Sequence, residues 1–69
     1  MDRKRVNSSK IRSIGYDEKT QTLEVELSNG QLWQYGKVYP EVYRRFMAAP
    51  NPTSFFEDRI AEDYAGKRV

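Results

Sequence analysis

The chemistry open to this 69-residue chain is limited first by two absences, because the sequence contains no cysteine and no histidine. Histidine is the side chain most often used for acid–base catalysis near neutral pH, and it is the commonest transition-metal ligand. Cysteine would supply a thiolate nucleophile, a zinc ligand or a disulfide. We therefore expect a non-enzymatic protein with no catalytic residues, no metal site and no cofactor.

Pairs of adjacent carboxylates are the remaining candidates for metal binding or acid–base work. They are Asp17-Glu18, Glu57-Asp58 and Glu62-Asp63. None has the spacing of a calcium-binding loop, and adjacent residues on a helix do not converge on one point. We interpret these pairs as solvated surface residues.

Basic side chains are better candidates for binding, because they are segregated along the chain. Residues 1–12 carry five basic side chains and one acidic one, a net charge of +4, whereas the other 57 residues carry seven basic and nine acidic ones, a net charge of −2. Clustered Lys and Arg neutralise phosphates and give salt-sensitive binding to nucleic acid. The candidate RNA contacts are Arg3, Lys4, Arg5, Lys10 and Arg12, with Arg44 and Arg45 as a second surface.

Plainer explanations exist for both basic groups, and they stay open. A short charged terminus is common and can simply keep a protein soluble. On a helix, Glu41 and Arg45 have the favourable i, i+4 order for an ion pair within the helix.

Trp33 and Tyr35 form the most conspicuous aromatic pair, and alternate aromatics on a strand can stack on unpaired bases. A chain of this size buries only about 60% of the surface of its unfolded form, so its large rings are needed inside. We therefore interpret the pair as a structural core motif. Tyr39, which lies outside these patterns, is the candidate for contact with a protein partner.

The elements that must position these residues begin with strands. Residues 11–16 are compatible with a strand, residues 22–27 alternate strictly between apolar and polar, and residues 31–36 form a third run. The fold class predicted is α+β, a three-stranded antiparallel β-meander followed by two short helices packed on one face. Residues 1–10 are expected to be a mobile basic arm, residues 11–66 a single domain, and residues 67–69 a frayed tail.

The length of the loop after the second strand decides which face the two large aromatics join. A two-residue Asn-Gly turn would put both rings beside the glutamates. A three-residue loop with a left-handed Gly30 instead pairs Val25 with Trp33 and Leu23 with Tyr35. We favour the longer loop, because it buries both rings with the aliphatic side chains.

The same argument applied to the first hairpin favours a four-residue loop at residues 17–20. This loop places Ile14 opposite Leu23 and Tyr16 opposite Gln21, with Ile14 and Tyr16 on the core face. The outer face is then acidic and has no aromatic residue; it consists of Ser13, Gly15, Thr22, Glu24, Glu26, Leu32 and Gln34.

Helix signals follow the strands. Pro40 suits the first turn of a helix, and apolar residues recur at helical spacing from there to Met47. Ser54 and Glu57 have the spacing of a capping box, which predicts the start of a second helix. Its apolar stripe is expected to consist of Phe56, Ile60 and Tyr64.

The order of these elements and their landmark residues resemble the KTSC domain, named after the C-terminal domain of some lysyl-tRNA synthetases. The resemblance is carried by Val6, Ser8-Ser9, residues 11–17, residues 23–27, Trp33-Gln34-Tyr35, Val38, residues 40–43, residues 48–50, Phe55, Phe56, Ile60 and Tyr64. Trp33 replaces the first tyrosine of the family's central Tyr-x-Tyr motif, and this keeps an aromatic ring there. The resemblance implies a small domain of unestablished function, for which RNA binding is suggested by the synthetase fusion.

Two functions remain in view. The first is weak binding of RNA or another single-stranded nucleic acid through the basic arm. The alternative is an adaptor that docks onto a protein without binding nucleic acid, with Tyr39 as anchor and an open sheet edge for strand addition. No signal peptide or membrane span is visible, so we expect a cytoplasmic protein of a bacterium or phage.

Overall fold

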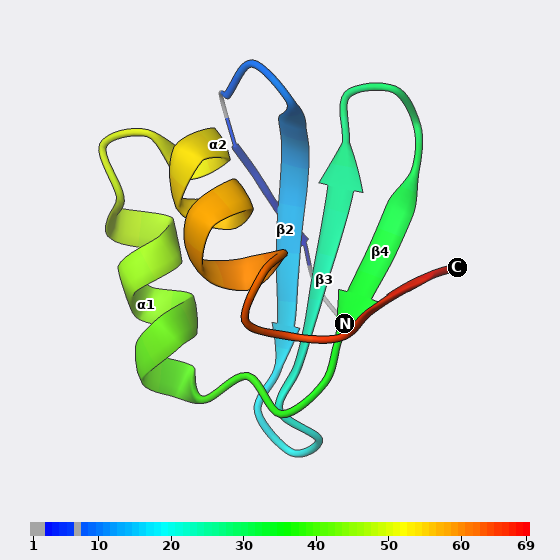
Figure 1. Ribbon diagram of the computed structural model, residues 1–69, viewed down its shortest axis with the longest axis vertical. Coiled ribbons are helices and arrows are strands. Elements are labelled where there is room, and N and C mark those ends of the chain that lie inside the picture. The colour runs from blue at the N-terminus through cyan, green and yellow to red at the C-terminus, as the bar shows by residue number, and fades with distance from the viewer. Residues whose placement is uncertain (1–2, 7) are drawn as a thin grey trace.

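The computed structural model describes residues 3–6 and 8–69, and within them the chain forms five antiparallel strands and two short helical segments. The first segment is α1, and the second consists of α2 and the η1 turn that directly continues it. The strands lie side by side in the order β1-β2-β3-β4-β5. In Figure 1 the helices lie toward the β2 side of the sheet, and none of them lies over β4. The elements are β1 (Arg3–Arg5), β2 (Ile11–Asp17), β3 (Thr22–Leu27), β4 (Leu32–Tyr35), α1 (Pro40–Ala48), α2 (Pro52–Phe55), the π-helix η1 (Phe56–Ile60) and β5 (Gly66–Arg68).

The α+β class is confirmed, but the prediction of three strands is wrong. β1 comes from the expected basic arm, and β5 joins the last residue of the expected domain, Gly66, to the expected tail. Each is three residues long and wholly polar or glycine, so neither shows the apolar alternation by which a strand is recognised in a sequence. They are held by backbone pairing with β2 and β4 at the two edges of the sheet.

The predicted register between β3 and β4 is confirmed. Leu23 pairs with Tyr35 and Val25 with Trp33, as the three-residue loop requires. Gly30 is left-handed at a φ of 93°, a conformation that glycine adopts at little cost. The two aromatics of β4 therefore share the helix-facing side of the sheet with the aliphatic residues of β3.

The predicted register between β2 and β3 is wrong by two residues. Tyr16 pairs with Leu23 rather than Gln21, and Ile14 pairs with Val25. The loop has four residues, as expected, but lies one position further along the chain, because Gln21 adopts a left-handed φ of 55° and belongs to it. A shift of two residues keeps each side chain on its predicted face, so Ile14 and Tyr16 still point toward the helices.

A β-bulge at Arg12 places two isoleucines of β2 in the core and leaves the strand order unchanged. The pairing passes from Ile11↔Leu27 to Ser13↔Glu26, which leaves Arg12 as the extra residue on β2. Ile11 and Ile14 are both fully buried as a result, although their odd spacing would place them on opposite faces of a regular strand.

Each helical segment covers this core with one stripe of apolar side chains. Pro40 opens α1 as predicted, and Phe46 is its fully buried residue. The second helical segment begins at Pro52, and its cap is the Asn51 side chain, which accepts a bond from the Ser54 N–H at 3.2 Å. The capping box predicted at Ser54 is therefore wrong. The core is made of Ile11, Ile14, Leu23, Val25, Tyr35, Val38, Phe46, Phe56 and Ile60.

Candidate nucleic-acid interface

Basic charge is concentrated on the two edge strands of the sheet, β1 and β5, which we call the basic edges. Their five cations, all exposed, are Arg3, Lys4, Arg5, Lys67 and Arg68. Among the described residues, no carboxylate lies within 4.0 Å of any of them. Lys67 and Arg68 were missed by the sequence analysis, because the tail was interpreted as frayed. The only signal for them was the adjacency of two cations.

The strand registers divide these cations between the two faces of the sheet. Arg3 and Arg5 share the outer face with Gly15 and Ser13, their partners on β2, and Lys67 shares it with Gln34. Glu24 and Glu26 occupy the middle strand of that face. The outer face is thus acidic at its centre, as predicted, but it has basic margins on both sides.

Three other cations predicted to contact RNA already have carboxylate partners among the described residues. Lys10 lies 3.2 Å from Glu57, Arg12 lies 4.0 Å from Glu26, and Arg45 lies 2.8 Å from Glu41. Such exposed pairs contribute at most about 1 kcal/mol to stability, but they offset the positive charge locally. Arg44 is exposed on α1. The seven predicted cations are therefore spread over β1, β2, the segment before β2, and α1.

The two aromatics of β4 differ in burial. Tyr35 is 4% exposed and belongs to the core, with its ring edge-on to Phe56 at a centroid distance of 5.7 Å. Trp33 packs against this core but is only half-buried, and its ring lies 6.4 Å from that of Tyr35. Its indole N–H donates to the side-chain oxygen of Gln31 at 3.2 Å. Trp33 therefore has one side in the protein and another at the surface.

A cavity of about 340 Å³ lies beside this indole, on the helix-facing side of the sheet. We call it the Trp33 hollow, and it is lined by Leu27, Gln31, Trp33, Tyr35, Phe56, Ala61 and Gly66. Arg68 pairs with Trp33 across β4 and β5, so the two side chains are neighbours on this face. A second cavity of about 370 Å³ shares Leu27 and Phe56 with the hollow and reaches the ion pair of Lys10 and Glu57.

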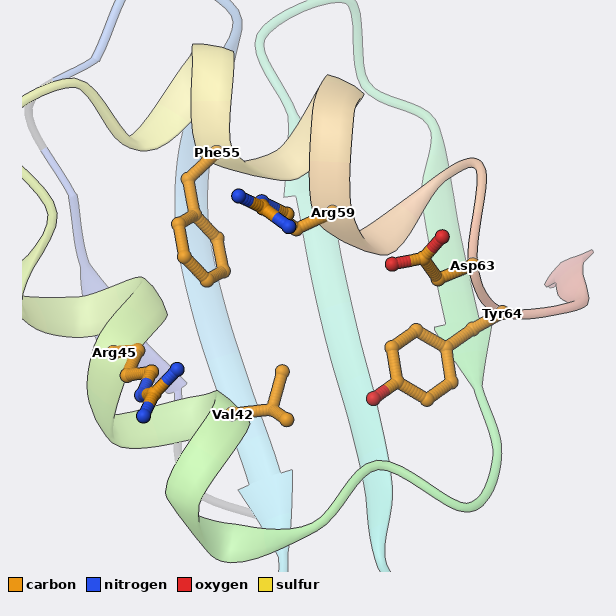
Figure 2. Close-up of a pocket in the computed structure, with 6 residues that line it drawn as sticks. All are labelled: Val42, Arg45, Phe55, Arg59, Asp63 and Tyr64. Atoms are coloured by element: carbon orange, nitrogen blue, oxygen red, sulfur yellow. The ribbon is translucent and has the colours of Figure 1, made fainter.

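A third cavity, of about 290 Å³, lies between α1 and the end of the second helical segment. Figure 2 shows Arg45 and Arg59, from different helices, around an apolar floor that includes Val42 and Phe55. The carboxylate of Asp63 lies across from them, and Arg45 is paired with Glu41 outside the cavity. Opposite charges therefore balance at this cavity, and it offers a phosphate less attraction than the basic edges do.

Tyrosine hydroxyls elsewhere serve the packing of the core. The Tyr16 hydroxyl donates to the backbone oxygen of Val38, and the Tyr16 ring stacks on that of Tyr43 at 4.7 Å. Burial raises the pKa of Tyr16, with smaller contributions from nearby acidic groups, first Glu18. Burial also raises the pKa of Tyr35. Both hydroxyls therefore stay protonated at physiological pH.

Tyr39, the predicted protein contact, is 63% exposed at the start of α1. In the described part of the chain, no group of three or more acidic, cysteine or histidine side chains could hold a metal ion. Over the same residues, no helix has the length and apolar character needed to cross a membrane.

Comparison with known proteins relates this architecture to one family. The sequence profile of the KTSC domain matches residues 7–64. An uncharacterised protein of Stutzerimonas stutzeri strain A1501 is 47% identical over 49 residues, which are 71% of this chain and 69% of that protein. The crystal structure of a KTSC domain protein from Yersinia pestis matches with a TM-score of 0.92 and 32% identity, over 99% of this chain and 96% of that one. Most of the Trp33 hollow falls within the profile match, whereas both basic edges fall outside it.

Proposed function

The chain belongs to the KTSC domain family, and from that premise we propose that it is a non-enzymatic module that binds single-stranded RNA through its basic edges. One observation carries this proposal. Both edge strands bear cations and no anions, and no carboxylate within the described residues lies close enough to neutralise them. Unpaired cations of this kind attract phosphates and release counterions on binding.

The number of cations sets the strength of the expected salt dependence. For a single strand, the logarithm of the affinity falls with the logarithm of the salt concentration by about 0.7 for each phosphate neutralised. Five contacts would give a slope of about −3.5. We therefore expect weak binding that depends strongly on the salt concentration. The same charges also keep the sheets of different copies of the chain from pairing edge to edge.

Fluorescence polarisation with a labelled single-stranded RNA, measured from low to physiological salt, tests the proposal. A variant with Arg3, Lys4 and Arg5 changed to Gln is expected to reduce the slope by about 2, and the double variant Lys67→Gln/Arg68→Gln by about 1.4. The matched control is Arg44→Gln on α1, which is expected to leave the slope unchanged. Absence of binding at low salt, or an equal effect of the control, would reject RNA as the ligand.

A second candidate function is protein docking, which is supported by the exposure of Tyr39. An exposed aromatic can anchor a protein partner, and an open strand edge can accept another strand. This function predicts that a partner retained by the wild-type chain is lost by Tyr39→Ala and kept by a variant in which all five edge cations are Gln. The reverse pattern would contradict docking through Tyr39.

A further inference from the structure

We propose that the Trp33 hollow binds one unpaired base of the RNA, while Arg68 holds an adjacent phosphate; this inference rests on the proposed function and assigns it a base-binding site. The hollow is lined by residues of β4, by Phe56 of η1 and by Ala61, the residue after η1. The basic edge β5 runs along the same side of the sheet. The fold therefore places an aromatic surface and an unneutralised cation next to each other.

The walls of the hollow suit a flat and largely apolar ring. Trp33, Tyr35 and Phe56 contribute aromatic surface, and Leu27 and Ala61 contribute aliphatic surface. Tyr35 and Phe56 are committed to the core, with exposures of 4% and 9%, but Trp33 is only half-buried. Because every base has a π-face, stacking on an open indole can bind a base whatever its sequence.

Gln31 gives the hollow a polar group in addition to its apolar walls. Its side-chain oxygen accepts the indole N–H of Trp33 at 3.2 Å, which fixes the orientation of the ring. The amide NH₂ of the same side chain remains a donor, and a carbonyl oxygen on the edge of a base would accept from it. A purely apolar ligand would gain nothing from this donor.

Charge around the hollow indicates where the backbone of the ligand would lie. Arg68 is the register partner of Trp33 and has no carboxylate within 4.0 Å among the described residues. Glu57, in the neighbouring cavity, is paired with Lys10 at 3.2 Å, so its repulsion of a phosphate is offset. The phosphate next to the bound base would therefore lie at the β5 side.

The experiment uses Trp33 itself as the probe, because it is the only tryptophan of the chain. Oligouridylate and an abasic oligonucleotide of equal length and charge are titrated separately at low salt. Oligouridylate is expected to quench and shift the Trp33 emission and to bind about tenfold more tightly than the abasic strand. The abasic strand is expected to bind through its phosphates alone and to leave the emission nearly unchanged.

Variants separate the base from the phosphate. Trp33→Leu is expected to weaken oligouridylate binding about tenfold and to leave abasic binding unchanged, with polarisation of a labelled strand as the readout. Arg68→Gln should weaken both ligands equally. Gln31→Ala alters only the mouth of the hollow and should weaken oligouridylate selectively, so it serves as the test if Trp33→Leu fails to fold. Tyr39→Leu changes an exposed aromatic that does not line the hollow, so it is the matched control and should change neither ligand.

The outcomes distinguish this site from the proposed function. Equal binding of both strands with unchanged Trp33 emission would overturn the base site and leave RNA contact at the basic edges standing. Failure of both strands to bind would overturn both proposals. An emission change with an apolar peptide, but none with oligouridylate, would assign the hollow to a protein partner and overturn the base site.

Discussion

The two halves of the sheet are built from similar strands but have different surroundings. Under the helices, Ile14 of β2 and Leu23 and Val25 of β3 are completely buried. On the neighbouring strand β4, Trp33 shares their face but is only partly buried, and the edge strand β5 is exposed throughout. The helices therefore cover β2, β3 and Tyr35 of β4, which we call the covered half. They leave Trp33 and the exposed edge strands β1 and β5 at the surface, and we call these the uncovered half.

The largest expected effect is a direct test of this contrast between covered and uncovered aromatics. Phe46→Ala, under full burial, is expected to cost about 3–5 kcal/mol and to leave much of this small domain unfolded. Trp33→Ala removes a larger ring but should cost less, about 2–3 kcal/mol, because part of that ring already contacts water. Urea denaturation followed by circular dichroism measures both. A greater loss for Trp33→Ala would reject the contrast.

The next effect concerns the strand that closes the uncovered half. A Cβ placed on Gly66 would lie 2.4 Å from the ring of Tyr35, the partner of Gly66 on β4, so Gly66→Ala requires the ring or the strand to move. We expect a loss of about 1–3 kcal/mol in the free energy of unfolding. Gly36→Ala is the control, because a Cβ there meets no atom within 4 Å. Thermal unfolding of the two variants should separate them clearly, and equal losses would contradict this close approach.

A smaller effect is expected from the hydrogen bond that joins Tyr16 to Val38, in the segment that leads into α1. Tyr16→Phe removes the hydroxyl that donates to the Val38 oxygen and should cost about 1 kcal/mol. The raised pKa of Tyr16 means that the folded state holds the phenolic proton more tightly than the unfolded chain does. This contribution is complete below the ordinary pKa of 10.0 and is lost as the pH rises through the higher folded value.

Alkaline titration of stability therefore checks the same residue independently. The free energy of unfolding of the wild type should fall as the pH rises above about 10, and it should fall less steeply in Tyr16→Phe. Tyr35, whose pKa burial also raises, should maintain part of the fall in that variant. Identical slopes for the two proteins would show that the Tyr16 hydroxyl is not protected by folding.

The smallest effect is expected on the outer surface of the covered half. Glu41→Gln breaks the ion pair with Arg45, which is exposed on both sides, and should cost about 0.5 kcal/mol or less at low salt. The difference should shrink further as salt is added. A loss comparable to that of Gly66→Ala would mean that surface charge, rather than burial, stabilises this half.

The hairpin of β3 and β4 was the part of the sheet that the sequence predicted best, for a physical reason. Strict alternation in β3 and the left-handed conformation available to Gly30 determined both the faces and the register of the β3–β4 hairpin. Pro40 at the first turn of α1 is equally local information. The first hairpin was placed two residues out of register, because nothing in its sequence indicates that Gln21 turns left-handed.

The uncovered half depends on tertiary context, which explains what the sequence analysis missed. β1 and β5 contain no buried apolar residue and exist by pairing with their neighbours, so no local pattern announces them. In the covered half, the sequence analysis also missed the π-helical turn at residues 56–60 and the cap at Asn51. The alternation of β4 predicted that Trp33 lies on the core face of the sheet. How much of that face is buried depends on how far the helices extend, and no strand pattern specifies the extent of the helices.

A single measurement tests most directly whether the uncovered half is the binding surface. In a titration of the ¹⁵N-labelled chain with single-stranded RNA at low salt, amide shifts are expected along β4 and β5, at Ala61 and on the basic strand β1, and they should vanish at high salt. The amides of Val25 and Phe46, in the covered half, should stay in place. Shifts concentrated on α1 around Arg44, or no shifts at low salt, would contradict the account.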